Sequence, residues 1–336
     1  MVKHILDTRQ FKDREFLEAF FDRTDHMARD VRNEEATGQK LSRPYEGKTV
    51  ASLFYQPSTR TKMLLDSAAK KLGAQVIGTE NAREFSSAFK GETLEHSMQA
   101  TEYGFDVAVL RHPQNGSAKR AASVSKKPVI NAGDGTNQHP IQALTDLYTM
   151  MWKFGRIDDL KIGFVGDMEH GRTVKSLVYL LAHLNNHRLS FVAPEELAMP
   201  ADIRAYLREK SVRFDETDDL DKVLPNVDAL YVTRLQLEYV RNPFKRWMLK
   251  KSYRDFQITP ERADMMTGGS VIMHPLPINT EKSNGYPEIT GEVDSHPRAC
   301  YFEQSNNKLY VGMAMFDALL GRDRYLRDMI LDPSAI

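Results

Sequence analysis

Two kinds of hydrophobic spacing alternate along the chain. Short runs of β-branched and apolar residues, of which residues 49–54 are a clear case, predict buried strands. Between these runs lie longer segments with apolar residues at helical spacing, beginning with an amphipathic segment over residues 11–36. This alternation predicts repeated strand–helix units, which usually build parallel sheets.

The first series of such units covers about the first 150 residues. Its pattern predicts four strands and two further helices, at residues 49–54, 73–78, 106–110 and 128–131 and at residues 61–72 and 139–154. In the helix at 61–72 we expect Met63, Leu64, Ala68 and Leu72 to share the buried face. The polar segment from Asn81 to Lys90 lacks periodicity, so we expect a loop there, followed by a capped helix start near Thr93.

A second series begins near Leu160. It predicts strands at residues 161–166, 189–192, 212–214 and 229–232, a helix at 172–184 and a last helix at about 310–331. Two series joined by one helix predict an α/β chain of two doubly wound parallel-sheet domains, with the active site in the cleft between them. We expect residues 1–150 to form the first domain, completed by a C-terminal helix over about 308–336, and residues 151–307 to form the second.

Composition narrows the class of protein. With 41% hydrophobic and 27% charged residues, the 336-residue chain can bury proper cores. Its formal net charge is zero, which argues against a nucleic-acid or membrane-surface partner, and no apolar run approaches the roughly 18 residues of a membrane span. The start of the chain has no apolar secretion segment, and the single Cys300 rules out an internal disulfide. We therefore expect a cytoplasmic protein.

The most informative stretch for chemistry is Ser58-Thr59-Arg60-Thr61. It stands where a predicted strand ends and a helix begins, and the first N–H groups of a helix lack partners and favour an anion. Arg60 adds a guanidinium that can bind a phosphate bidentately. The residues alone leave a second explanation open, an ordinary helix cap by Ser58 or Thr59.

Five more motifs follow predicted strands or begin predicted helices. They are Arg111-His112-Pro113-Gln114, Asn137-Gln138-His139-Pro140-Ile141-Gln142, Gly171-Arg172-Thr173-Val174, Thr233-Arg234-Leu235-Gln236 and His274-Pro275-Leu276-Pro277. Each has a plain structural explanation when taken alone; for His139, a capping role in the first helical turn is the simpler one. Residues 166–171 lack the glycine spacing of a dinucleotide site, and no metal motif is present, so we expect neither cofactor nor metal.

Together, and in this order, the six motifs resemble those of the aspartate and ornithine carbamoyltransferases, in the form found in aspartate carbamoyltransferase catalytic chains. The resemblance covers about residues 5–330. It implies transfer of a carbamoyl group from carbamoyl phosphate to L-aspartate, giving N-carbamoyl-L-aspartate and phosphate early in pyrimidine biosynthesis. The alternatives are a carbamoyltransferase for another amine, such as ornithine, and a non-catalytic paralogue.

The resemblance also implies a role for each site residue. The catalytic residues it implies are Arg60, Thr61, Arg111, His139 and Gln142. The residues implied to bind carbamoyl phosphate are Ser58, Thr59, Arg60, Thr61, Ser86, Lys90, Arg111, His139, Gln142, Pro275 and Leu276. The residues implied to bind aspartate are Lys90, Arg172, Arg234, Gln236 and Leu276. Because Ser86 and Lys90 match a loop that enters a neighbouring subunit, a homotrimer with shared sites is expected, alone or within a larger assembly.

Some positions depart from the family pattern. Gln56 stands where many relatives have Glu, Tyr239 where some have Arg, and Ile278 where many have Arg. The first two departures suggest that one ion pair formed on domain closure is absent here. The segment Asn279 to Pro297 is longer than usual and is expected to be a surface excursion, and the basic run at residues 241–254 is expected to be a solvated, closing loop rather than a nucleic-acid site.

Overall fold

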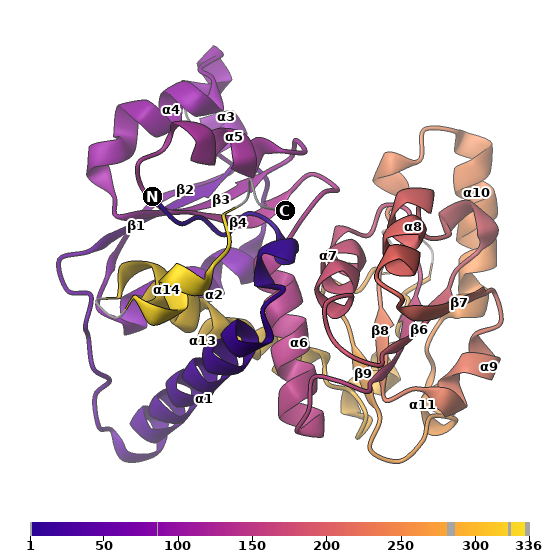
Figure 1. The fold of residues 1–336 in the computed structure, drawn as a ribbon. Coiled ribbons are helices and arrows are strands. Elements are labelled where there is room, and N and C mark those ends of the chain that lie inside the picture. The colour runs from indigo at the N-terminus through magenta and orange to yellow at the C-terminus, as the bar shows by residue number, and fades with distance from the viewer. Residues whose placement is uncertain (1, 86, 281–285, 322–323, 333–336) are drawn as a thin grey trace. The chain divides into compact units, whose positions relative to one another are not determined.

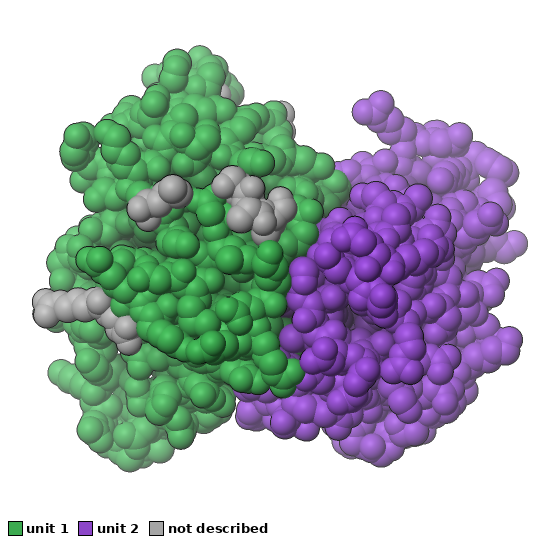
Figure 2. Space-filling view, in the orientation of Figure 1, with its two compact units in different colours: residues 1–148, 306–336 green, residues 149–305 purple. Residues whose placement is uncertain are grey.

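The computed structural model describes residues 2–85, 87–280, 286–321 and 324–332 (Figure 1). The chain divides into two compact units (Figure 2). Unit 1 comprises residues 1–148 and 306–336, and unit 2 comprises residues 149–305. Both boundaries fall within helices, since one lies inside α6 and the other inside α13.

Unit 1 is built on a parallel sheet in the order β2-β1-β3-β4. The strands are β1 Thr49–Phe54, β2 Gln75–Glu80, β3 Val107–His112 and β4 Val129–Asp134. Phe54 at the end of β1 pairs with Arg111 near the end of β3, and the amide of Tyr55 donates to the Arg111 carbonyl at 2.8 Å. Because both strands end at the same edge of the sheet, this register brings the residues that follow β1 next to Arg111.

Helices cover both faces of this sheet, with α4 and α5 on one face and α2 and α13 on the other (Figure 1). The helices of this part of the chain are α1 Arg14–Thr37, α2 Thr59–Lys71, α3 Ala82–Phe85, α4 Leu94–Thr101, α5 Ser117–Val124, α6 Pro140–Phe154, α13 Tyr301–Leu320 and α14 Tyr325–Met329. One buried cluster joins the sheet to α4 and α5 through Ala51, Ala108, Leu94, Met98 and Ala118. Burial of this apolar surface is the main favourable term that fixes the loops at the sheet edge.

Unit 2 has a five-stranded parallel sheet in the order β7-β6-β5-β8-β9. Its strands and helices are β5 Lys161–Val165, α7 Arg172–Leu181, β6 Arg188–Val192, α8 Ala201–Glu209, β7 Arg213–Thr217, α9 Leu220–Val223, β8 Ala229–Val232, α10 Pro243–Ser252, α11 Pro260–Asp264 and β9 Val271–Met273. The strand order reverses direction between β5 and β8, the position where ligands bind in doubly wound sheets. The prediction of two parallel α/β sheets is confirmed.

Several details of the pattern-based prediction are wrong. The segment from Asn81 to Lys90 contains helix α3 and a 3-10 turn, Ser87–Lys90, rather than only a loop. In α2 the side chain of Met63 is exposed, and Leu65 takes its place on the buried face. The segment after Asn279 was expected to lie on the surface, but the side chain of Glu288 in this segment is buried, at 1% exposure.

The last helix also differs from its prediction. Helix α13 begins at Tyr301 and ends at Leu320, and residues 325–329 form a separate helix. Its first half carries polar residues that are nevertheless buried: Gln304, Asn307 and Lys308. Because these polar residues interrupt the apolar spacing, the sequence pattern hides the first turns of the helix.

Candidate active site

The Ser58-Thr59-Arg60-Thr61 motif forms the N-terminus of α2. Ser58 is the N-cap residue, but within the described part of the chain its hydroxyl makes no capping hydrogen bond to the helix. The structure therefore does not use Ser58 as an ordinary cap, and the free N–H groups of the first turn remain available to an anion. Thr61 is buried beneath this turn, at 4% exposure.

Arg60 brings an uncompensated charge to the same place. The residue is exposed, and among the described residues its guanidinium makes no hydrogen bond or ion pair. Neighbouring atoms displace enough water to lower the pKa of Arg60, and no carboxylate opposes that effect. A cation that loses water without gaining a partner favours binding of an anion.

Arg111 is held beside this motif by the sheet. Its carbonyl accepts from Tyr55, as described above, and its Nη1 donates to the carbonyl of Ala132 at 3.3 Å. Ala132 lies in β4, so the Arg111 side chain lies across the carboxyl ends of two neighbouring strands. Unit 1 therefore places the residues that follow β1, with the α2 N-terminus and Arg60 among them, at the same sheet edge as Arg111.

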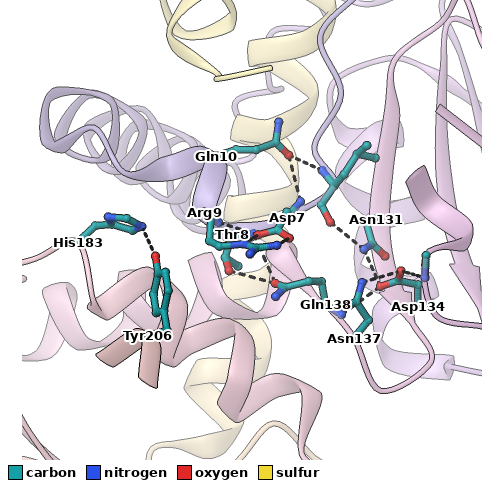
Figure 3. A network of polar contacts seen from close by, with 12 residues as sticks. Asp7, Thr8, Arg9, Gln10, Asn131, Asp134, Asn137, Gln138, His183 and Tyr206 are labelled. Carbon is teal, nitrogen blue, oxygen red and sulfur yellow. Dashed lines mark hydrogen bonds and ion pairs between the residues drawn. The ribbon is translucent and has the colours of Figure 1, made fainter. Parts of the chain in front are cut away.

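A polar network fixes the turn that leads from β4 to His139 (Figure 3). The buried carboxylate of Asp134 accepts from the side chain of Asn131 at 3.0 Å and from the amide of Gln138 at 3.1 Å. The hydroxyl of Thr8, from the N-terminal segment, donates to Oε1 of Gln138 at 3.0 Å. This bracing defines the backbone position of His139, the residue immediately before helix α6.

His139 immediately precedes α6 and Gln142 lies in its first turn, and both are 3% exposed. Nδ1 of His139 lies 3.4 Å from the amide nitrogen of Gln142, an arrangement in which Nδ1 accepts and the ring proton is on Nε2. The side-chain nitrogen of Gln142 donates to Oδ1 of Asp146 at 2.7 Å. Asp146 thereby fixes the direction of the Gln142 amide, so that its carbonyl oxygen is the group left to accept from a ligand. Sequence reasoning missed Asp146, whose only signal is its position one helical turn after Gln142.

In unit 2, Asp167 joins the loops that follow β5 and β8. Its buried carboxylate accepts from the amide of His170 at 2.9 Å and from the amide of Gln236 at 3.1 Å. It also hydrogen-bonds to the His170 ring at 3.1 Å, which raises the pKa of that ring. This network positions Gln236 and the turn leading to Arg172, the first residue of α7.

Close packing of these two loops requires a glycine. Gly166 has φ +120°, and a Cβ there would lie 2.3 Å from the carbonyl oxygen of Thr233. The hydroxyl of Tyr253, which donates to the same carbonyl at 2.5 Å, would also clash with it. Gly166 therefore serves the close packing of these loops.

Arg234 is engaged by a carboxylate of its own loop. It forms a two-bond ion pair with Glu238, in which Nη1 lies 3.3 Å from Oε2. The ring of Tyr239 stacks on His170, with centroids 5.6 Å apart and planes 10° apart. The arrangement shows that the Arg234 side chain can pair with a carboxylate in this position.

The loop after β9 is held by a residue that sequence reasoning missed. Glu288 accepts from Nε2 of His274 at 3.0 Å and from the amide of Asn279 at 3.0 Å. Nδ1 of His274 in turn accepts from the amide of Leu276 at 2.7 Å. Leu276 has φ +54°, a conformation that is unfavourable for a leucine and is held in place by this chain of bonds. Glu288 lies in the segment expected to be a surface excursion, so no pattern marked it.

The remaining predicted residues lie as follows. Thr59 is the first residue of α2, Lys90 is exposed at the end of the 3-10 turn, and Pro275 is partly buried beside Leu276. Ser86 lies outside the described residues. The part of the chain that the structure describes contains no group of three or more His, Cys, Asp or Glu side chains able to hold a metal ion.

These features agree with known families. Residues 3–151 match the family model described as "Aspartate/ornithine carbamoyltransferase, carbamoyl-P binding domain", and residues 158–319 match "Aspartate/ornithine carbamoyltransferase, Asp/Orn binding domain". The chain belongs to the aspartate/ornithine carbamoyltransferase family. The resemblance stated from the motifs is thereby confirmed at the level of the family.

Similar carbamoyltransferases come from plants, archaea and protists. The chloroplastic aspartate carbamoyltransferase of Oryza sativa subsp. japonica is 43% identical over 317 residues, which are 94% of this chain and 84% of that protein. The aspartate transcarbamoylase catalytic subunit of Methanocaldococcus jannaschii superposes with a TM-score of 0.83 at 38% identity, covering 96% of this chain and 100% of that one. The Trypanosoma cruzi enzyme in complex with N-(phosphonacetyl)-L-aspartic acid superposes with a TM-score of 0.84 at 32% identity, covering 94% of each chain.

Proposed function

We propose that the chain is an aspartate carbamoyltransferase, which converts carbamoyl phosphate and L-aspartate into N-carbamoyl-L-aspartate and phosphate, an early step of pyrimidine biosynthesis. The observation that carries the proposal is the unpaired Arg60 at a helix start without a side-chain cap, in the segment that follows β1, whose last residue Phe54 pairs with Arg111 on the neighbouring strand. The names of the similar proteins, aspartate carbamoyltransferases at 40–43% identity, support the choice of aspartate. The T. cruzi enzyme has been solved with carbamoyl phosphate and aspartate bound.

The first step of the reaction is to hold the phosphate. Ser58, Thr59, Arg60 and Thr61 donate to its oxygens together with the free N–H groups of α2, and Arg111 bridges the phosphate and the carbonyl oxygen. Charge-assisted bonds of this type are roughly twice as strong as neutral ones. Held in this way, the phosphate leaves as an anion that is already hydrogen-bonded, so less charge has to be solvated during the reaction.

The carbonyl oxygen gains negative charge when the amine attacks. Thr61, Arg111 and the Nε2–H of His139 are the donors proposed to stabilise it. Gln142 accepts from the carbamoyl NH2, because Asp146 already holds its own NH2 group and leaves the carbonyl oxygen to face the substrate. These roles require no metal ion and no cofactor.

Aspartate brings two carboxylates, and unit 2 supplies two arginines for them. We assign Arg172, Arg234 and Gln236 to these carboxylates, with the substrate replacing Glu238 as the partner of Arg234. The carbonyls of Pro275 and Leu276 accept from the carbamoyl NH2 and from the attacking amine. Planar guanidinium groups bind carboxylates bidentately, which favours a dicarboxylate over ornithine, whose second charge is positive.

The experiment that tests the proposal is phosphate release from carbamoyl phosphate, measured with aspartate and then with ornithine. We expect turnover with aspartate and none above background with ornithine. Comparable rates with the two amines would refute the substrate assignment, and no release with either would favour a non-catalytic paralogue.

The assembly is a separate proposal. We infer a homotrimer with shared sites, to which Ser86 and Lys90 contribute across the subunit boundary; the exposure of Lys90 is compatible with such a role. Lys90→Ala and Arg60→Ala proteins should each be nearly inactive, whereas trimers reassembled from both should regain activity. A mixed trimer without recovery would contradict the composite site.

The cytoplasmic location stays a prediction of the sequence. Across the residues that the structure describes, no helix has the length and apolar character needed to cross a membrane. The plant relatives carry the word chloroplastic in their names, which is a property of those proteins. Cell fractionation with antibodies to the chain tests the compartment directly.

A further inference from the structure

The loop that carries Arg234 is held by a residue that the proposed roles leave out. Tyr253 follows α10 directly, at the start of a 3-10 turn over Tyr253–Phe256, and it is 3% exposed. Its hydroxyl donates to the carbonyl of Thr233 at 2.5 Å. Thr233 is the residue immediately before Arg234. Tyr253 therefore acts on the backbone from which the Arg234 side chain starts.

The bond from Tyr253 fixes the peptide group that joins Thr233 to Arg234. A peptide group is planar, so a fixed carbonyl oxygen also fixes the nitrogen and Cα of the next residue. The amide of Thr233, directly after the last residue of β8, donates to the carbonyl of Val165 at 2.8 Å. Thr233 is thus held at its amide by β5 and at its carbonyl by Tyr253. Together the two bonds define the position of the Arg234 Cα.

The backbone that follows Arg234 is held as well. The amide of Gln236 donates to the carboxylate of Asp167 at 3.1 Å, and the carbonyl of Leu235 accepts from the side-chain nitrogen of Asn279 at 3.3 Å. Arg234 therefore lies between two fixed parts of its loop. Because a guanidinium binds a carboxylate bidentately only in a narrow range of orientations, a shift of either part should weaken that binding.

The Tyr253 ring is itself fixed by the core of unit 2. It packs against Phe256 with ring centroids 6.2 Å apart, and Phe256 belongs to the buried cluster that contains Val165 and Val232. Burial, the largest cause, and nearby carboxylates raise the pKa of Tyr253 well above its ordinary value. The hydroxyl therefore stays protonated and remains a donor to the loop.

We propose that Tyr253 is a positioning residue for the substrate dicarboxylate, whose hydroxyl holds the Thr233–Arg234 peptide so that Arg234 is in place before aspartate binds. This inference rests on the proposed function, because it takes Arg234 as a ligand of an aspartate carboxylate. Tyr253 acts through Arg234. A loop that is ordered in advance lowers the cost of binding, so the effect of Tyr253 is on the affinity for aspartate.

The test is steady-state kinetics of Tyr253→Phe, which removes the hydroxyl and keeps the ring. The matched control is Tyr301→Phe, because Tyr301 is also a buried tyrosine of unit 2 and its hydroxyl donates to Asp294 at 2.5 Å. We expect Tyr253→Phe to raise the KM for aspartate roughly tenfold and to change kcat by less than about twofold, since binding shared by substrate and transition state appears in KM. The KM for carbamoyl phosphate should not change, and Tyr301→Phe should leave all three constants unchanged.

A merely structural role for Tyr253 predicts a different pattern. Both variants lose a buried hydrogen bond, so both should unfold at a lower temperature than the unmodified protein. Only the loss of positioning changes the KM for aspartate. An unchanged KM for aspartate in folded Tyr253→Phe, or an equal rise in Tyr301→Phe, would overturn the proposal.

Amide hydrogen exchange of the unmodified protein tests the same point without a variant. The amides of Thr233 and Gln236 are hydrogen-bonded in the structure, so both should be protected before any aspartate is added. Fast exchange of both amides in the free protein, with protection only after aspartate is added, would show that the substrate orders the loop. That result would overturn the role of Tyr253 even if Tyr253→Phe did not fold.

Failure of this inference can be told apart from failure of the proposed function. Turnover of aspartate by the unmodified protein, with an unchanged KM in Tyr253→Phe, would overturn the role of Tyr253 alone. No turnover of aspartate by the unmodified protein would refute the proposed function, on which the inference rests.

Discussion

Glu288 offers a sharp test of how the loop after β9 is held. Replacing it by Gln keeps the shape of the side chain but removes the negative charge of the group that accepts hydrogen bonds from His274 and from the amide of Asn279. Because the carboxylate is 1% exposed, water cannot replace the lost charge. We therefore expect Glu288→Gln to weaken the loop and to displace the carbonyl of Leu276.

The magnitude follows from the bonds involved. A buried hydrogen bond to a charged group contributes about 1.5–3 kcal/mol, and Glu288→Gln weakens two of them without deleting either partner. Leu276, at φ +54°, stores about 1–2 kcal/mol of backbone strain that the weakened loop can release, which offsets part of the loss. The net destabilisation should be about 1–3 kcal/mol. If the carbonyl of Leu276 accepts from the attacking amine, a similar loss in the transition state lowers turnover by about tenfold to a hundredfold.

The assay compares thermal unfolding and steady-state kinetics of Glu288→Gln with those of Glu292→Gln. Glu292 is an exposed carboxylate four residues further along the same segment, so the control makes the same change without a buried network. The expected pattern is a lower melting temperature and a lower kcat for Glu288→Gln alone. Equal stability and equal kcat in the two variants would refute the reasoning, because the buried network would then have no role in holding the loop.

Three further predictions concern unit 2 and the strand end of unit 1. Arg234→Ala should lower kcat/KM for aspartate by about a hundredfold, since a charge-assisted pair contributes roughly 2–3 kcal/mol. Glu238→Gln, which removes the partner of Arg234 in the free protein, should not lower kcat/KM. Steady-state kinetics test this prediction, and equal losses of kcat/KM in the two variants would contradict it. The hydrogen bond to Asp167 raises the pKa of His170. The contribution of this bond to the free energy of unfolding is therefore complete below about pH 6.5 and is lost as pH rises through the pKa in the folded protein. Chemical denaturation at several pH values should show the free energy of unfolding decline by less than about 1 kcal/mol, and His170→Gln should abolish that decline. Oε1 of Gln56 is buried without a partner among the described residues. Gln56→Glu should therefore place an uncompensated charge there, lower stability by about 1–3 kcal/mol and fail to improve activity. A variant that is more stable in thermal unfolding or more active in kinetic assays would show that a donor is present.

The local pattern of the sequence was sufficient for the strands that carry the site. Residues 49–54 and 229–232 form strands with the predicted bounds, because continuous β-branched and apolar runs are typical of strands buried on both faces. The positions of Arg60, Arg111 and Arg234 near strand ends followed from the same patterns, since the polar residue after a buried strand marks its carboxyl end. Their chemical roles did not follow from the patterns, and depended on the resemblance to a family.

The tertiary structure decided which polar residues are internal. Lys308 and Glu288 lie in segments that look polar in the sequence, yet both are buried. Glu288 is buried with hydrogen-bonding partners, the ring of His274 and the amide of Asn279. Hydrophobic periodicity reports on apolar side chains that pack together, and it counts every charged residue as exposed.

The polar networks of the site depend on partners that are distant in sequence. Thr8 meets Gln138 at a separation of 130 residues, and Asp167 meets the amide of Gln236 at a separation of 69. Such pairs form only after the sheets have brought strand ends together, and their energy depends on the removal of water from both partners. A linear pattern contains neither the register nor the burial, so the fold class and the motifs could be read from the sequence, while the groups that orient the site became visible only in the folded chain.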